Sequence, residues 1–351
     1  MNKIKIICTL GPASYKKKII NNLKKQKVDI LRINLSHTNI NQIEKKILYL
    51  KKNKVKNICI DTEGAQLRTT EVKKPFIVKK KRNIKIFNNN KTSNQKEVYI
   101  QPSFSIEKIK IGTKLFIGFN NLCLKVFKNN KKENYLECKV IEEGIVESRK
   151  GVHLNQNIIL PPLSNKDKFA LLLAKKYKIK NFAISFVNSE KDIIEVKKII
   201  GNKSFIISKI ETINAIKNLR GISKNSSALL IDRGDLSRYI PIEKIPIAQE
   251  LIIKETKKIK KPTYVATNLL ETMIKENLPT RAESHDIYST LKQGASGLVL
   301  AAETAIGKNP LNSVNFLKKC IAVYNRSSKP NIKYFNKRYE FFKKSYKKYN
   351  C

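Results

Sequence analysis

Two side chains of opposite charge, Lys209 and Glu211, stand at the end of one predicted strand. They follow an apolar, β-branched run at 205–207 that is typical of a buried strand. Side chains two positions apart on a strand point to the same face, so we expect the ammonium and the carboxylate to emerge together. Such a pair can hold a divalent metal and an anionic substrate side by side. Taken alone, it is more typical of a simple ion pair at a strand end.

Three further predicted strands also end in polar residues. The runs 228–231, 262–266 and 297–301 lead respectively to Asp235, to Thr267 and to Glu303 with Thr304. The strands alternate with amphipathic helical stretches such as 247–259 and 311–323, which predicts βα units and a parallel sheet. Polar groups collected at successive strand ends form the active sites of (β/α)8 barrels. The sequence therefore predicts an α/β protein, a (β/α)8 TIM barrel.

The pattern changes in the middle of the chain. Short alternating runs separated by Asn-rich turns begin near residue 72 and end near 157, which predicts an inserted all-β domain. We expect the barrel to comprise residues 1–71 and 158–330. Residues 331–351 form a basic, aromatic tail with one predicted aromatic stripe on a helix. That stripe could pack on the barrel, or it could serve as an arm for RNA or an anionic membrane.

Nine short segments, in order along the chain, carry a resemblance to a known family. They are residues 8–14, 31–37, 61–69, 185–187, 209–211, 233–236, 266–268, 279–283 and 303–305. Together they resemble pyruvate kinase. The resemblance implies transfer of the phosphoryl group of phosphoenolpyruvate to ADP, giving pyruvate and ATP in the last step of glycolysis. It also implies that 72–157 is a lid domain and that the family's C-terminal regulatory domain is absent.

The chemistry of the matching residues agrees with phosphoryl transfer, which needs mainly positioning and charge neutralisation. Glu211 and Asp235 offer hard oxygen ligands that suit Mg²⁺ or Mn²⁺. Lys209 would neutralise the transferring phosphoryl group and the developing enolate. Arg32 offers a planar fork for phosphate oxygens.

The remaining implied contacts concern the substrate carboxylate, a monovalent cation and the nucleotide. The amides of Gly234 and Asp235, with the Thr267 hydroxyl, would receive the carboxylate. The residues that match the family's potassium site are Asn34, Ser36, Asp61 and Thr62. Those that match its nucleotide site are His37, Arg68 and Lys150. Polar residues at strand ends also commonly just satisfy backbone groups, and that explanation stays open for the potassium set.

Several residues depart from the family pattern. Gln66 replaces the glutamate associated with potassium dependence, and Glu63 replaces a lysine. Tyr239 replaces a glutamate near subunit contacts, and Ala301 replaces a serine implicated in protonating the enolate. These changes leave the potassium requirement and the proton donor open.

Composition limits the alternatives. No apolar run approaches the ~18 residues of a membrane span, no signal peptide is visible, and the six cysteines have no metal-binding spacing. We expect a cytoplasmic homo-oligomer that binds phosphoenolpyruvate and ADP or ATP, with no membrane and no specific nucleic acid as partner. The net charge of +44 favours weak polyanion binding. Two other functions stay open: a degenerate, catalytically weak barrel kept to bind polyanions, and a carbon–carbon lyase on a related barrel.

Overall fold

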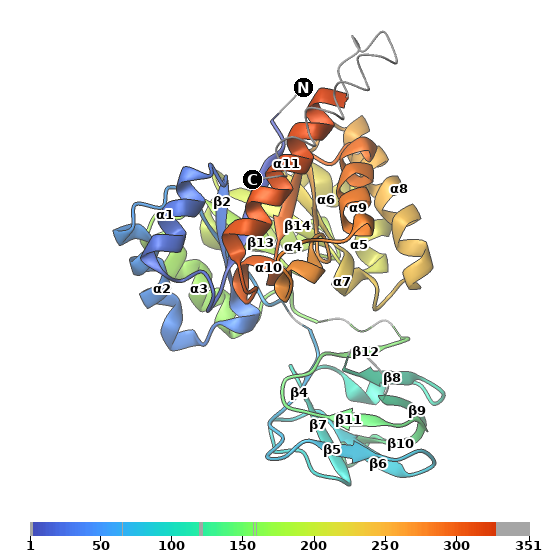
Figure 1. The fold of residues 1–351 in the computed structure, drawn as a ribbon. Helices are drawn as coiled ribbons and strands as arrows, with labels where there is room; N and C mark the ends of the chain where they lie inside the picture. The colour runs from blue at the N-terminus through green and yellow to red at the C-terminus, as the bar shows by residue number, and fades with distance from the viewer. Residues whose placement is uncertain (1–2, 65, 119–121, 157, 159, 328–351) are drawn as a thin grey trace. The chain divides into compact units, whose positions relative to one another are not determined.

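The computed structural model describes residues 3–64, 66–118, 122–156, 158 and 160–327 (Figure 1). The predicted tail at 331–351 lies outside the described residues. The chain divides into two compact units, one of residues up to 32 together with those from 250 onward, and one of residues 33–249. No described helix is long and apolar enough to cross a membrane.

A closed barrel of parallel strands forms the centre of the fold. The strand order is β1-β17-β16-β15-β14-β13-β3-β2. The strands are β1 (Lys5–Leu10), β2 (Ile30–Asn34), β3 (Ile58–Asp61), β13 (Asn181–Ile184), β14 (Phe205–Ile210), β15 (Ala228–Asp232), β16 (Thr263–Ala266) and β17 (Gly297–Leu300). The predicted (β/α)8 barrel is confirmed. Its strands are apolar and buried because a parallel sheet of this kind is covered on its faces.

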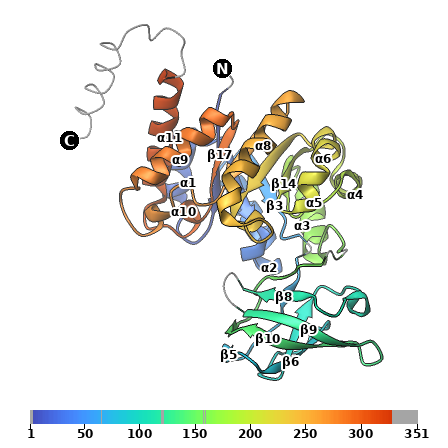
Figure 2. The ribbon, with the colours of Figure 1, turned by 90° about the vertical axis from the view of Figure 1, so that its right-hand side faces the viewer.

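Helices alternate with these strands along the chain. They are α1 (Lys17–Lys25), α2 (Ile40–Lys52), α3 (Asn165–Lys176), α4 (Glu190–Ile200), α5 (Ile213–Lys217), α6 (Leu219–Asn225), α7 (Arg233–Leu236), α8 (Ile245–Lys258), α9 (Arg281–Gln293), α10 (Ala302–Ala305) and α11 (Pro310–Ser327). Helix α2 buries Ile43, Ile47 and Leu50, whose spacing makes one apolar stripe. Helices α9 and α11 pack against each other (Figure 2).

The insertion is a mostly β domain, as predicted. Its larger sheet has the order β12-β8-β9-β10-β6-β7-β4, and β11 pairs with β5 (Figure 1). The strands are β4 (Arg68–Thr69), β5 (Phe76–Val78), β6 (Asn83–Phe87), β7 (Glu97–Gln101), β8 (Lys114–Ile117), β9 (Leu122–Asn130), β10 (Tyr135–Glu142), β11 (Gly144–Val146) and β12 (Val152–Leu154). Alternate residues such as Leu115 and Ile117, or Leu124 and Val126, fill its core.

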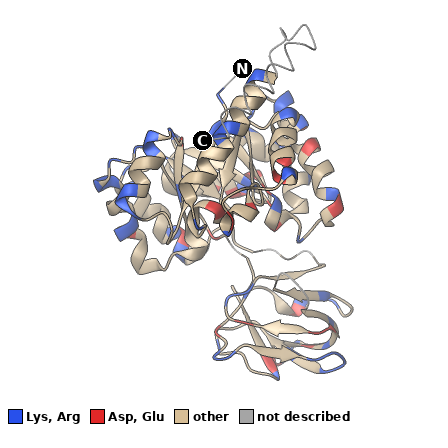
Figure 3. Ribbon diagram, viewed as in Figure 1, with Lys and Arg blue, Asp and Glu red and all other residues tan. Residues whose placement is uncertain are grey.

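The positive charge is distributed widely. Figure 3 shows lysine and arginine on the outer helices and on the β domain, rather than gathered in one patch of the face in view.

Candidate active site

The end of β14 carries a buried ammonium surrounded by carboxylates. Lys209 is 6% exposed and Glu211 is fully buried, and their Nζ and Oε1 atoms are 2.8 Å apart. Lys209 Nζ also lies 3.3 Å from Asp232 Oδ2 and 3.6 Å from Asp61 Oδ1. It donates a hydrogen bond to Ser185 Oγ at 3.0 Å. The two residues that the strand pattern predicted on one face are therefore in contact, and neighbouring strands add acidic partners.

The electrostatics of Lys209 favour its charged form. Burial opposes the charge, but Asp61, Glu211, Asp232 and Asp235 outweigh it and raise the pKa of Lys209 well above its ordinary value. Lys209 is thus a permanent cation embedded among four acidic side chains.

Three of these carboxylates form a candidate metal site. Ligand oxygens of Glu211, Asp232 and Asp235 all lie within 4.8 Å of one another. Burial raises the pKa of Glu211 well above its usual range, and Asp235 and Asp232 add to the effect although Lys209 opposes it. Burial and the charge of Asp232 likewise raise the pKa of Asp235. Carboxylates packed this closely are compatible with ionisation only beside additional positive charge.

Asp232 was not among the predicted ligands. It is the last residue of β15, and Ile210 pairs with Ile231 in the parallel register, so Glu211 and Asp232 follow on adjacent strands. The sequence does place Asp232 directly after the predicted strand 228–231, but the prediction assigned the metal-ligand role to Asp235 in the motif Arg233-Gly234-Asp235 that follows. Gly234 lies in the four-residue helix α7 beside Asp235, and its carbonyl accepts a hydrogen bond from Ser237 Oγ at 2.7 Å.

A divalent cation fits this donor set. The oxygen-only ligands are those that Mg²⁺ and Mn²⁺ prefer. The four carboxylates of Asp61, Glu211, Asp232 and Asp235 face Lys209, and Asp235 also contacts Arg238, with Nη2 and Oδ1 3.2 Å apart. Negative charge exceeds positive charge in this cluster, which a bound divalent ion would compensate.

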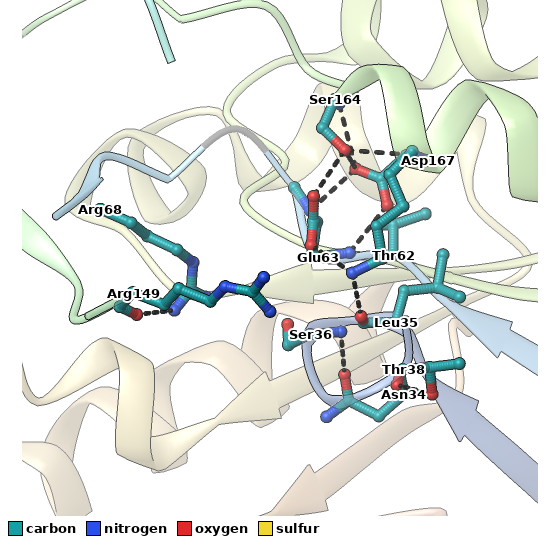
Figure 4. Close-up of polar contacts among 12 residues, drawn as sticks. Asn34, Leu35, Ser36, Thr38, Thr62, Glu63, Arg68, Arg149, Ser164 and Asp167 are labelled. Atoms are coloured by element: carbon teal, nitrogen blue, oxygen red, sulfur yellow. Dashed lines mark hydrogen bonds and ion pairs between the residues drawn. The ribbon is translucent and has the colours of Figure 1, made fainter. Parts of the chain in front are cut away.

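The four residues of the predicted potassium site lie at the ends of the neighbouring strands β2 and β3 or just after them, and Figure 4 shows three of them, Asn34, Ser36 and Thr62. Asn34 Oδ1 accepts the Ser36 amide at 2.9 Å, which closes the turn η1 (Leu35–His37). The Thr62 carbonyl accepts Ser185 Oγ at 2.6 Å, and Asp61 faces Lys209 as described above.

An ammonium group links the two segments. Lys166 Nζ donates to the Leu35 carbonyl at 2.5 Å and to Glu63 Oε2 at 2.8 Å. Asp167, at the start of α3, accepts the amides of Glu63 and Gly64 at 2.8 and 3.0 Å. The departure of Glu63 from the family pattern is therefore accommodated by a salt bridge with Lys166.

The predicted nucleotide residues are only partly grouped. The Arg68 and Lys150 segments are joined, because the Thr69 amide donates to the Lys150 carbonyl at 2.9 Å. Arg68 Nη1 donates to the Arg149 carbonyl at 3.2 Å (Figure 4), and Lys150 Nζ lies 3.1 Å from Glu147 Oε2. His37 is on the separate turn η1 and is exposed.

Two predicted residues, Arg32 and Thr267, lie in the unit of residues up to 32 and from 250 onward. Arg32 on β2 is 4% exposed, and its Nε and Nη2 both donate to Thr9 Oγ1, at 2.9 and 2.6 Å. Thr9 was not predicted as its partner. Thr267 directly follows β16 and has a φ of 78°, a conformation that a β-branched residue rarely adopts. Such strain often accompanies a functional position. Glu303 accepts the amides of Ala301 and Leu270 at 2.7 and 3.1 Å.

Comparison with known proteins identifies the family. Residues 1–314 match the family model described as pyruvate kinase, barrel domain. The chain belongs to the pyruvate kinase family. It is 34% identical to pyruvate kinase of Thermotoga maritima over 91% of this chain and 70% of that protein. It is 31% identical to the chloroplastic pyruvate kinase isozyme G of Nicotiana tabacum, over 90% of this chain and 58% of that protein.

A solved structure supports the assignment. The crystal structure of a pyruvate kinase from Cryptosporidium parvum matches with a TM-score of 0.83 and 29% identity, over 92% of this chain and 69% of that one. This chain thus spans between 58% and 70% of the length of these pyruvate kinases.

Proposed function

We propose that the chain transfers the phosphoryl group of phosphoenolpyruvate to ADP, giving pyruvate and ATP. The observation that carries the proposal is the Lys209 ammonium, 2.8 Å from Glu211 and 3.3 Å from Asp232 in a cluster suited to a divalent cation. Family membership supplies the substrates.

Lys209 acts on the charge that moves during the transfer. Its ammonium neutralises the phosphoryl group and the enolate oxygen that develops, and a fixed charge in a dry site needs no reorganisation at that moment. The Ser185 hydroxyl, 3.0 Å away, helps to hold the ammonium in place. A magnesium or manganese ion, when held by Glu211, Asp232 and Asp235, supplies a Lewis acid for the substrate carboxylate and enolate oxygens.

We propose that the other predicted residues bind the substrate, the nucleotide and a monovalent cation. Arg32, oriented by Thr9, binds the substrate phosphate, and Thr267 with the Gly234 and Asp235 amides binds the carboxylate. His37, Arg68 and Lys150 bind the nucleotide. A potassium ion at Asn34, Ser36, Asp61 and Thr62 would add the positive charge that this acidic region lacks. We assign 72–157 as a lid over a barrel of 1–71 and 158–330, in a homo-oligomer.

The burial of the cluster favours an enzyme over a degenerate polyanion-binding barrel. Lys209 and Glu211 are 6% and 0% exposed, and ionic groups buried this deeply cost stability unless they are fully paired. An apolar replacement would stabilise a barrel kept only for its surface charge.

The test couples pyruvate formation to NADH oxidation by lactate dehydrogenase. The purified protein with phosphoenolpyruvate, ADP and Mg²⁺ should oxidise NADH, and EDTA should abolish the signal. Glu211→Gln should lose the activity while its fold, followed by circular dichroism, persists. Lys128→Met, which breaks only an exposed ion pair, should keep the activity. A wild-type protein that binds Mg²⁺ but makes no pyruvate would refute the proposal.

A further inference from the structure

Hydrogen-bond donors gather around Arg238, the residue that pairs with Asp235. Arg238, which follows α7, has a side chain only 15% exposed, with Nη2 3.2 Å from Asp235 Oδ1. Gln66 is 6% exposed, and its amide nitrogen Nε2 has no hydrogen-bond partner among the described residues. A buried amide donor without an acceptor costs about 1–3 kcal/mol, so this one points to an absent ligand that accepts hydrogen bonds.

A glycine keeps the space between these donors open. A Cβ atom on Gly151 would lie 2.8 Å from Arg238 Nη1 and 3.1 Å from Gln66 Nε2. The two nitrogens are therefore within about 6 Å of each other, across a position that only a glycine leaves empty. An oxygen bonded to both at about 2.9 Å fits that span.

A second guanidinium group, that of Arg68, interacts electrostatically with Arg238. Burial lowers the pKa of Arg68, and the positive charge of Arg238 lowers it further, while Glu63 and Asp235 act in the opposite direction. Glu63 already pairs with Lys166 at 2.8 Å, and Asp235 belongs to the metal cluster. Two half-buried guanidinium groups that repel each other gain most from an anion placed between them.

We propose that Arg238 and the Gln66 amide, together with Arg68, bind the terminal phosphate of the nucleoside diphosphate. The proposal rests on the proposed function and adds Arg238 and Gln66 to its predicted nucleotide residues. The guanidinium fork suits a phosphate because it can donate two parallel hydrogen bonds. Asp235 holds one edge of the fork, so the group is oriented before the nucleotide arrives.

Calorimetric titration of ADP and of inorganic pyrophosphate into the protein with Mg²⁺, without phosphoenolpyruvate, tests this without turnover. Arg238→Met should weaken both ligands by at least about tenfold, and Gln66→Met by roughly three- to tenfold. Arg238→Lys keeps the charge but loses the fork, so it should recover only part of the affinity. The matched control is Arg82→Met, an exposed arginine of the β domain, which should bind as the wild type does.

Two further measurements separate the alternatives. Gly151→Ala keeps every donor but fills the space between them, and it too should weaken both ligands. If the loss in Arg238→Met disappears at saturating Mg²⁺, Arg238 acts only through Asp235 and the proposal is overturned. Wild-type affinity in Arg238→Met, or an equal loss in Arg82→Met, overturns it as well. A protein that makes no pyruvate yet loses pyrophosphate binding in Arg238→Met would refute the proposed function and leave this site standing.

Discussion

Replacing Lys209 by methionine should affect folding and catalysis in distinguishable ways. The change removes the ammonium that lies 2.8 Å from Glu211, 3.3 Å from Asp232 and 3.6 Å from Asp61, and keeps most of the side-chain volume. Breaking a buried ion pair by deleting one partner costs about 3–5 kcal/mol. Protonation of one carboxylate relieves part of this cost, so we expect about 3 kcal/mol in the metal-free protein.

Divalent metal should reverse much of that loss. An ion bound at one hundred times its dissociation constant stabilises the folded state by about 2.7 kcal/mol, and the extra uncompensated carboxylate charge should tighten its binding. Urea unfolding in EDTA measures the stability lost with the ammonium, and unfolding in MgCl2 measures how much stability the metal restores. The increment from Mg²⁺ should be larger in Lys209→Met than in the wild type.

Turnover should not recover with the metal. Deleting one electrostatic group that stabilises the transition state costs roughly 10²–10³-fold in kcat, and the coupled pyruvate assay measures this directly. Lys128→Met is the control, because its partner Glu137 is 3.5 Å away and the lysine is 61% exposed; it should change stability by less than about 1 kcal/mol. Near-normal turnover in Lys209→Met, or equal stability of the two variants in EDTA, would refute the reasoning.

Three other perturbations follow from the same contacts. Asp232→Asn removes one of the three metal-site carboxylates and should raise the Mg²⁺ needed for half-maximal activity roughly tenfold; an unchanged requirement in a metal titration would exclude Asp232 as a ligand. Burial, and then Arg238, lower the pKa of His153 from 6.5 to about 4, so the folded state binds fewer protons and stability should fall as pH drops from 6.5 towards 4. The loss is at most about 3 kcal/mol before solvent screening, and urea unfolding of His153→Phe should lack it. Thr9→Val removes the acceptor of Arg32 and should raise KM for phosphoenolpyruvate several-fold, whereas an unchanged KM would show that Thr9 does not position Arg32.

Local patterns predicted the barrel and the centre of the site. Strand periodicity placed Lys209 and Glu211 on one face, and the structure has their charged atoms 2.8 Å apart. The alternation of apolar strands with amphipathic helices predicted the parallel barrel, because each of these patterns can be recognised within a short segment of the sequence.

Contacts between distant segments could not be predicted in this way. Lys166 reaches the Leu35 carbonyl across 131 residues, and the space beside Gly151 depends on side chains of Gln66 and Arg238 from other parts of the chain. Periodicity within one element says nothing about such approaches. Asp232 is an intermediate case: its strand end was visible, but whether its side chain joins the Lys209 cluster depends on the register between β14 and β15.

The charge of the cluster connects fold and function. A barrel that buries Asp61, Glu211 and Asp232 around one lysine is less stable than one with apolar residues there, because each carboxylate loses hydration that a single ammonium does not replace. The same deficit of positive charge would favour the binding of a cation at this site, beside Lys209. The acidic residues that lower the free energy of unfolding of the metal-free barrel should therefore raise its affinity for a divalent metal. In variants of these residues, the metal dependence of unfolding and that of turnover should then change together.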